Sequence, residues 1–384
     1  MKVALVCDWL TEIGGAEQVL LRLHQMYPEA PIYTSQYRPK TAPWFRDCDV
    51  RTGWLNIFPR RLRRFMAPLR SVYFKHLKLS DYDLVISVCN AEAKFIGVEG
   101  GVHVSYLQGP PTQYYWGLYD QYIANPGFGA LNPIARLGLK VLLKPMRRAD
   151  LTGSKRPDLL IANSSYVQSE IKKYYSRPSA VVNPPVKAKE METAAKKVKS
   201  KDVKAIKSKL FGGEDFYIVA GRQVSWKRFD LAISACRKLK RNLLVVGDGP
   251  EHSNLVKLAS EDRHIKFLPR YNGASEIARY FVAARGLIFP SLEPFGIVPV
   301  EAMACGLPVV AYGQGGSRDM VIEGKNGVFF GEQSANSLAK GIEKFEKISF
   351  DKKRIVKLAE RFDEVEFNKN FEKAVDEALR QGKK

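Results

Sequence analysis

The sequence is short of the features that mark disulfide-stabilised, metal-binding and membrane-spanning proteins. Its 384 residues hold five scattered cysteines with no CxxC pair and no grouping with histidines, and an odd number of isolated thiols favours reduced cysteines over a disulfide framework. No apolar run approaches the ~20 residues of a membrane-spanning helix. Met1-Lys2 leads directly into a strand-like run at residues 3–7, with no cleavable signal. These absences predict a cytoplasmic protein.

Acidic residues are also scarce relative to basic ones. Lys and Arg number 61 and Asp and Glu 40, for a formal net charge of +21. This excess favours an acidic partner, namely nucleic acid, an anionic lipid surface or a phosphorylated substrate. Charge alone does not choose among the three.

The chain is longer than one hydrophobic core usually serves, since single cores stop growing at ~250–300 residues. Strand-like apolar runs alternate with amphipathic stretches of helix length, and this alternation predicts an α/β protein with parallel sheets in two Rossmann-like domains. The runs are 3–7, 84–88, 102–107 and 159–162 in the first half, and 217–220, 243–246, 265–268, 287–289 and 309–311 in the second. The expected parts are an N-terminal acceptor-side domain at 1–186, a Lys-rich linker at 187–212, a C-terminal nucleotide-sugar domain at 213–350, and a helical segment at 351–384 that packs back toward the N-terminal domain.

Three loops that follow strands carry candidate chemistry, because ligands of such sheets bind at the carboxyl ends of strands. The first, residues 8–17, contains Gly14-Gly15, which lets the backbone approach a ligand while the following helix start offers N–H groups to an anion. An ordinary glycine turn is the alternative. The second contains Arg222 and Lys227, which suit a diphosphate, with a solvated basic turn as the alternative.

The third stretch, 291–316, begins as a loop after a strand and holds two glutamates with a Phe-Gly between them. A helix that starts near Ile297 would direct N–H groups of residues 296–298 toward a ligand, and a carboxylate at Glu293 or Glu301 accepts hydrogen bonds from sugar hydroxyls. The alternative is a pair of surface acids. A plain helix start does not need Phe295-Gly296, which favours the binding interpretation.

These residues resemble the GT4 family of retaining glycosyltransferases, which have the GT-B fold. The stretch EPFGIVPVE at 293–301 matches the family's E-x7-E motif, and the resemblance continues through GGAE at 14–17, NSSYVQSEI at 163–171, NPPV at 183–186, GRQVSWKRFDLAI at 221–233, VVGDGPE at 245–251 and EAMACGLPVVAYGQGG at 301–316. The similarity is greatest to bacterial mannosyltransferases of surface-polysaccharide assembly.

The resemblance assigns roles to residues. It implies that Glu293 lies beside the donor sugar, that Glu301 binds the nucleotide ribose, and that Arg222 and Lys227 neutralise the diphosphate. The donor-binding set it implies is Gly14, Gly15, Gly221, Arg270, Phe295, Gly296, Ile297, Val298 and Glu301. Similar enzymes carry a histidine where this chain has Gln108, which forms hydrogen bonds but cannot become cationic. Nearby His103 is expected in the core.

The resemblance also implies the reaction. A hexose, expected to be mannose from GDP-mannose, would pass with retention to a lipid-linked or other glycan, with no metal and no cofactor. The DxD sequences at 47–49 and 81–83 are interpreted as structural. A UDP-sugar donor is one alternative. A nucleotide-sugar 2-epimerase of the same fold and a non-catalytic nucleic-acid-binding protein are the others, although no recognisable nucleic-acid module is found.

Two basic and apolar stretches, 54–79 and 136–148, are typical of segments that lie on anionic membranes. We expect them to place the protein on the inner face of the cell membrane and to meet the membrane or the acceptor. The alternative is a helical hairpin whose apolar face packs in the core and whose arginines are solvated. The expected surface residues are Arg60, Arg61, Arg63, Arg64, Arg147 and Arg148.

Overall fold

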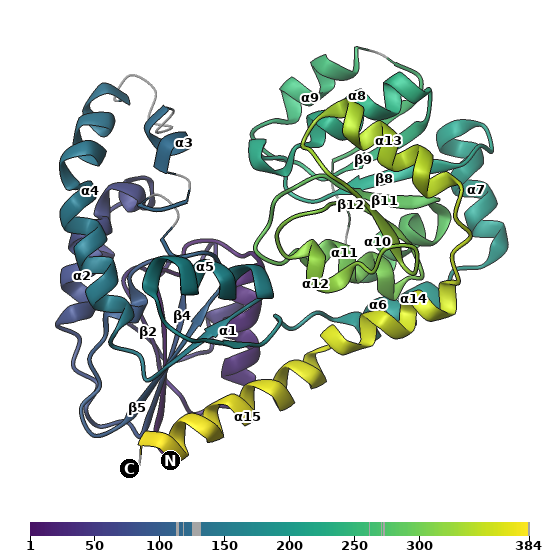
Figure 1. Ribbon diagram of the computed structural model, residues 1–384. Coiled ribbons are helices and arrows are strands. Elements are labelled where there is room, and N and C mark those ends of the chain that lie inside the picture. The colour runs from purple at the N-terminus through teal and green to yellow at the C-terminus, as the bar shows by residue number, and fades with distance from the viewer. Residues whose placement is uncertain are drawn as a thin grey trace. The chain divides into compact units, whose positions relative to one another are not determined.

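The fold is described from a computed structural model that covers residues 1–112, 115–117, 119–124, 132–260, 262–269, 271 and 273–382. The chain divides into two compact units, Met1–Pro185 with Phe367–Lys384, and Val186–Glu366. Each unit is a parallel sheet with helices on its faces (Figure 1).

The N-terminal unit has a sheet in the order β3-β2-β1-β4-β5-β6-β7, and all of its ladders are parallel. Its strands are β1 (Val3–Cys7), β2 (Ile32–Thr34), β3 (Val50–Thr52), β4 (Leu84–Cys89), β5 (Val102–Leu107), β6 (Leu159–Ala162) and β7 (Ala180–Val181). Its helices are α1 (Gly15–Met26), η1 (Pro43–Phe45), η2 (Trp54–Ile57), η3 (Arg60–Met66), α2 (Ala67–Lys75), η4 (Ala93–Phe95), α3 (Tyr119–Ala124), α4 (Asn132–Ser154) and α5 (Ser165–Tyr175).

Alternate residues of the central strands enter different cores of this unit. Leu5 packs with α1 on one face, and Val6 packs with α2 on the other. All residues of β4 and β5 are buried, as expected for strands covered on both faces. The prediction that His103 is a core residue is confirmed, since it is buried in β5 with its Nε2 2.9 Å from Ser87 Oγ.

The C-terminal unit has a parallel sheet in the order β10-β9-β8-β11-β12-β13. Its strands are β8 (Phe216–Ala220), β9 (Asn242–Val246), β10 (Ile265–Leu268), β11 (Gly286–Phe289), β12 (Val309–Tyr312) and β13 (Gly327–Phe330). Its helices are α6 (Ala188–Lys196), α7 (Ser200–Phe211), η6 (Ser225–Lys227), α8 (Phe229–Leu239), α9 (His252–Ala259), α10 (Gly273–Ala283), α11 (Ile297–Ala304), α12 (Ser317–Met320), α13 (Ala335–Glu346), α14 (Lys352–Ala359) and η7 (Glu360–Phe362).

The Lys-rich segment at 187–212 is not the connector that the sequence suggests. It forms α6 and α7, whose buried Met191 and Ile206 belong to the main core of the C-terminal unit. The many lysines lie on the outer face of these helices, and the few apolar residues at helical spacing make the packing face.

Helix α15 (Glu364–Gly382) begins in the C-terminal unit and belongs to the N-terminal unit from Phe367 onward. Phe367 and Phe371 are buried against the N-terminal core, with the Phe367 ring centroid 6.1 Å from that of Tyr106 in an edge-on contact. The C-terminal helix is therefore part of the N-terminal fold.

Candidate functional site

Close backbone packing brings together the loops after β8 and β9. A Cβ at Gly247 would lie 2.0 Å from the Gly221 carbonyl oxygen, and one at Gly249 would lie 2.3 Å from the Gln223 carbonyl oxygen. Gln223 reinforces the contact, because its Nε2 donates to the Gly247 carbonyl at 2.6 Å. Only glycine fits at these crossings, and they fix the course of the loop that leads to Lys227.

Lys227, after β8, and Glu293, after β11, form an ion pair. Lys227 Nζ lies 2.8 Å from Glu293 Oε1, and each side chain is 17% exposed. Ser291 Oγ donates to the same oxygen at 2.9 Å. Lys227 also lies over Gly221, where a Cβ would be 3.3 Å from Nζ. Two residues 66 positions apart thus form an ion pair that is largely shielded and still partly accessible to solvent.

The start of α11 is shaped by two glycine contacts. Gly296 caps the helix at φ +107°, and a Cβ there would lie 2.7 Å from Phe289 Cζ. Gly316 donates its N–H to the Glu293 carbonyl at 2.9 Å, and its own Cβ would lie 2.3 Å from Phe295 Cα. The glycine-rich turn after β12 therefore supports the loop that carries Glu293 and Phe295.

Glu301 has an unusual electrostatic environment. Burial is the main cause that raises its pKa to about 7; the nearby Glu190 carboxylate adds to the rise, and Lys227 opposes it. Burial and Glu301 together raise the pKa of Tyr271 to about 12. Neither Glu190 nor Tyr271 is predicted from the sequence, because Glu190 lies in the segment interpreted as a connector and Tyr271 belongs to no motif.

The remaining predicted donor residues are placed as follows. Arg222 is exposed in the loop after β8, and Ile297 and Val298 are half-buried in the first turn of α11. Phe295 is buried, with its ring centroid 5.4 Å from that of Phe362. Arg270 lies outside the described residues.

The N-terminal unit contributes a separate pocket at the carboxyl end of β1. Glu17 is buried there, and burial raises its pKa to about 7 although the backbone N–H groups of Glu17 and Gly14 hydrogen-bond its carboxylate and oppose the rise. Gln108 lines the same pocket and donates from Nε2 to the Ala16 carbonyl at 3.0 Å. A carboxylate of this unit thus lies against the Gly14-Gly15 turn, which was predicted to approach a ligand.

Several of the arginines expected on a membrane surface contact residues of their own unit. Arg60 and Arg63 pair with Glu12 at 2.7 and 2.9 Å, and Arg63 also stacks on Trp9. Arg147 donates to the Tyr115 carbonyl at 2.7 Å and lies over the Trp116 ring. Arg148 is exposed, and the side chains of Arg61 and Arg64 are outside the described residues.

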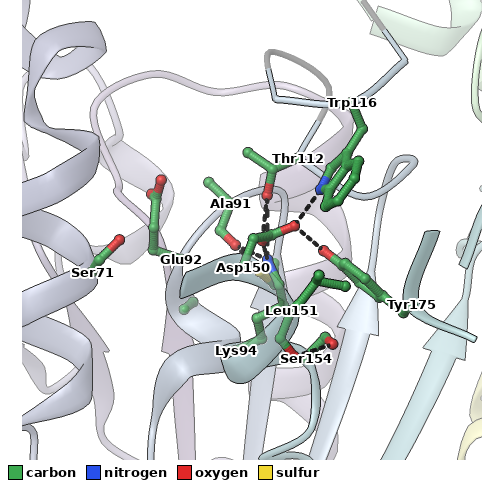
Figure 2. A network of polar contacts seen from close by, with 12 residues as sticks. Ser71, Ala91, Glu92, Lys94, Thr112, Trp116, Asp150, Leu151, Ser154 and Tyr175 are labelled. Atoms are coloured by element: carbon green, nitrogen blue, oxygen red, sulfur yellow. Dashed lines mark hydrogen bonds and ion pairs between the residues drawn. The ribbon is translucent and has the colours of Figure 1, made fainter. Parts of the chain in front are cut away.

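A buried ion pair anchors the loop that follows Gln108 (Figure 2). Lys94 Nζ lies 2.8 Å from Asp150 Oδ1, and both side chains are 1% exposed. Thr112, Trp116 and Tyr175 donate to the same carboxylate at 2.9, 2.7 and 2.8 Å. A carboxylate with four donors ties the segment after β5 to α4 and α5.

The acidic DxD sequences have structural contacts. Asp49 pairs with Arg51 at 2.7 Å, and Asp83 accepts the backbone N–H of Lys2 at 2.6 Å. Among the described residues no group of three or more His, Cys, Asp or Glu side chains is arranged to hold a metal ion. Within the same residues no helix has the length and apolar character needed to cross a bilayer.

The sequence matches one family model and several named proteins. Residues 200–364 match the family described as Glycosyl transferases group 1. The chain is 25% identical to the alpha-1,3/1,6-mannosyltransferase alg2 of Schizosaccharomyces pombe, over 82% of this chain and 68% of the relative. It is 32% identical to the GDP-mannose-dependent alpha-(1-6)-phosphatidylinositol monomannoside mannosyltransferase of Mycolicibacterium smegmatis, where the alignment covers 30% of this chain and 34% of the relative.

Among solved structures, Alr3699/HepE of Anabaena in complex with UDP superposes with a TM-score of 0.69 and 22% identity, over 98% of this chain and 100% of that one. The two parallel-sheet units have the GT-B fold of such glycosyltransferases. The fold and the group 1 match over most of the C-terminal unit support a glycosyltransferase.

Proposed function

We propose that the chain is a retaining, metal-independent glycosyltransferase that transfers mannose from GDP-mannose to a glycan acceptor, lipid-linked and reached at the inner face of the cell membrane. The Lys227–Glu293 ion pair carries the proposal, because it holds an ammonium and a carboxylate side by side at the carboxyl end of a parallel sheet. An ammonium there neutralises a diphosphate, and the carboxylate accepts sugar hydroxyls.

The mechanism follows from these groups. The bond between the anomeric carbon and the phosphate oxygen breaks through an oxocarbenium-like state, and Lys227 with Arg222 stabilises the charge that develops on the leaving diphosphate. The acceptor hydroxyl attacks the same face of the sugar and gives its proton to the departing phosphate oxygen. Glu301 and Tyr271 supply an acceptor and a donor for the nucleotide ribose.

The choice of mannose and GDP has support from two relatives that are named mannosyltransferases, one of them GDP-mannose-dependent. A UDP-sugar is the second candidate donor, since Alr3699/HepE was solved with UDP. A thermal-shift panel of GDP, UDP, ADP and their sugars separates the two. Ligand stabilisation follows RT ln(1 + [L]/Kd), so the cognate nucleotide is expected to raise the Tm most. A larger shift with UDP than with GDP would replace the donor, and no shift with any of them would contradict the proposed function.

A further inference from the structure

We propose that the outer face of α4, together with the adjacent face of α2, docks on an anionic lipid bilayer. The inference extends the proposed function and rests on it for the lipid-linked acceptor. The docking residues proposed here differ from most of the arginines that the sequence suggests for a membrane surface.

The starting observation is a second apolar stripe on α4. Its inner side packs through Ala135 and Met146, which are buried. Its opposite side carries Ile134, Leu137 and Val141, which are 70%, 64% and 65% exposed. Their spacing of three and four residues places them on one helical face. A surface helix needs one apolar face for its own core, so the second stripe calls for a partner outside the chain.

Helix α2 shares a small core with α4 and also carries exposed apolar side chains. Ala67 of α2 and Met146 of α4 belong to one small core, together with Tyr115. Leu69 and Val72 of α2 are 41% and 52% exposed. Most of the exposed large apolar side chains of the described residues fall within 54–72 and 134–142, namely Trp54, Ile57, Leu62, Leu69, Val72, Ile134, Leu137, Val141 and Leu142.

The charges around the stripe indicate the partner. Residues 132–149 contain no acidic residue, and Lys140, Lys144 and Arg148 are exposed beside the apolar stripe. By contrast, Arg60, Arg63 and Arg147 are held by contacts within their unit. A face that is both apolar and cationic matches an anionic bilayer, whose headgroups receive the cations while its acyl chains receive the apolar residues.

A second copy of the chain fits this face less well. A two-fold contact through α4 would bring Lys140, Lys144 and Arg148 against the same residues of the other copy, so like charges would meet. Nucleic acid supplies the negative charge and offers no apolar phase for Ile134 and Val141. The bilayer therefore satisfies both properties of the face.

The test is co-sedimentation of the full chain with vesicles of phosphatidylglycerol and phosphatidylcholine, and with vesicles of phosphatidylcholine alone. We expect binding to the first kind only. Lys140→Gln with Lys144→Gln should weaken it about 30-fold, because each cation near an anionic surface contributes about 1 kcal/mol. Leu137→Ser with Val141→Ser should weaken it by about tenfold or more, because less apolar surface enters the bilayer.

Matched variants on the other unit control for charge and surface apolarity. Lys201→Gln with Lys204→Gln removes the same charge from α7, and Val256→Ser with Val365→Ser removes exposed apolar side chains. Both should bind vesicles as the wild type does. Nucleotide-induced thermal shift, measured on every variant, tests folding and the proposed function separately from lipid binding.

Three results would overturn the inference. They are equal binding of the wild type to both vesicles, undiminished binding by the α4 variants, and equal loss in the α7 control. A concentration-dependent dimer that the α4 variants abolish would assign the face to a second copy instead.

Discussion

At the scale of single residues, the Lys227–Glu293 pair is the most specific feature of the C-terminal unit. Each partner is mostly shielded from solvent, so each stabilises the charge of the other while the donor is absent. A bound diphosphate would also stabilise the Lys227 ammonium, in part in place of the Glu293 carboxylate. The pair is therefore expected to be more important for transfer than for folding.

Lys227→Gln is expected to lower kcat about 10²–10³-fold, as loss of one preorganised donor to a developing anion does. The measurement is steady-state transfer with saturating donor. Lys257→Gln, an exposed lysine on α9, is the matched control and should keep wild-type turnover. Wild-type kcat in Lys227→Gln would show that the ammonium has no part in the reaction.

The pKa of Glu301 gives a pH-dependent prediction. Because its pKa is raised to about 7, the carboxyl is protonated below that pH and ionised above it. An ionised carboxylate accepts ribose hydroxyls better, so affinity for the nucleotide-sugar should rise as pH increases through about 7. Calorimetric titration with the nucleotide-sugar, whose diphosphate does not titrate near neutral pH, measures this.

Two variants sharpen the Glu301 test. Glu301→Gln should bind more weakly and with little pH dependence. Glu190→Gln removes a like charge, so it should lower the pKa of Glu301 and move the affinity profile to lower pH. A wild-type profile in both variants would remove Glu301 from the ribose site.

At the scale of elements, sequence patterns located the long buried strands and missed the short ones. The runs at 3–7 and 102–107 coincide with β1 and β5, because continuous apolar segments mark strands buried on both faces. The strands β2, β3 and β7 have only two or three residues, too few for a periodic signal. The lysines of α6 and α7 outnumber the buried residues of these helices, so the sequence suggested a solvated helical or flexible connector and not helices packed in the core.

Pairing between distant residues could not be predicted from residue patterns alone. Glu12 lies 48 positions from Arg60, and nothing in either neighbourhood reports that they meet. The same holds for Lys94 and Asp150. The resemblance to a known family assigned Lys227 and Glu293 to one donor, but it did not predict their ion pair.

The crossing of the loops after β8 and β9 predicts a stability effect. Gly249 has an ordinary φ, so Gly249→Ala tests only the steric contact with the Gln223 carbonyl. We expect a loss of ~2 kcal/mol or more in the free energy of unfolding, since backbone must shift. Gly331→Ala has open space around the new methyl and should change stability little. Urea denaturation measures the free energy of unfolding of both variants. Equal values for Gly249→Ala and Gly331→Ala would contradict the close contact between Gly249 and the Gln223 carbonyl.

The buried network around Asp150 predicts a larger effect. Lys94→Met removes the cation paired with a carboxylate that is 1% exposed, and an uncompensated buried charge typically costs ~3–5 kcal/mol. Lys357→Met breaks an exposed pair with Glu360 and serves as the control, with little expected change. Chemical denaturation followed by circular dichroism measures both. An unfolding midpoint of Lys94→Met equal to that of the wild type would show that the network does not hold the loop after β5.

At the scale of the whole molecule, two units of the same architecture carry different chemistry. The C-terminal unit gathers cations, carboxylates and glycine crossings at the ends of β8 and β11, and it contains the whole of the group 1 match. The N-terminal unit has an acidic pocket and, on α2 and α4, an exposed apolar and cationic face. This division agrees with donor recognition by one unit and acceptor or membrane recognition by the other.

The central claim is that the protein transfers a hexose from a nucleotide-sugar to a glycan. The most direct measurement follows the anomeric proton signals of GDP-mannose by NMR in the presence of a glycan acceptor. We expect the donor signal to be consumed as GDP and a product with the same anomeric configuration appear, and Lys227→Gln to slow both. Release of a free or epimerised hexose without acceptor, or an unchanged donor with every nucleotide-sugar tried, would contradict it.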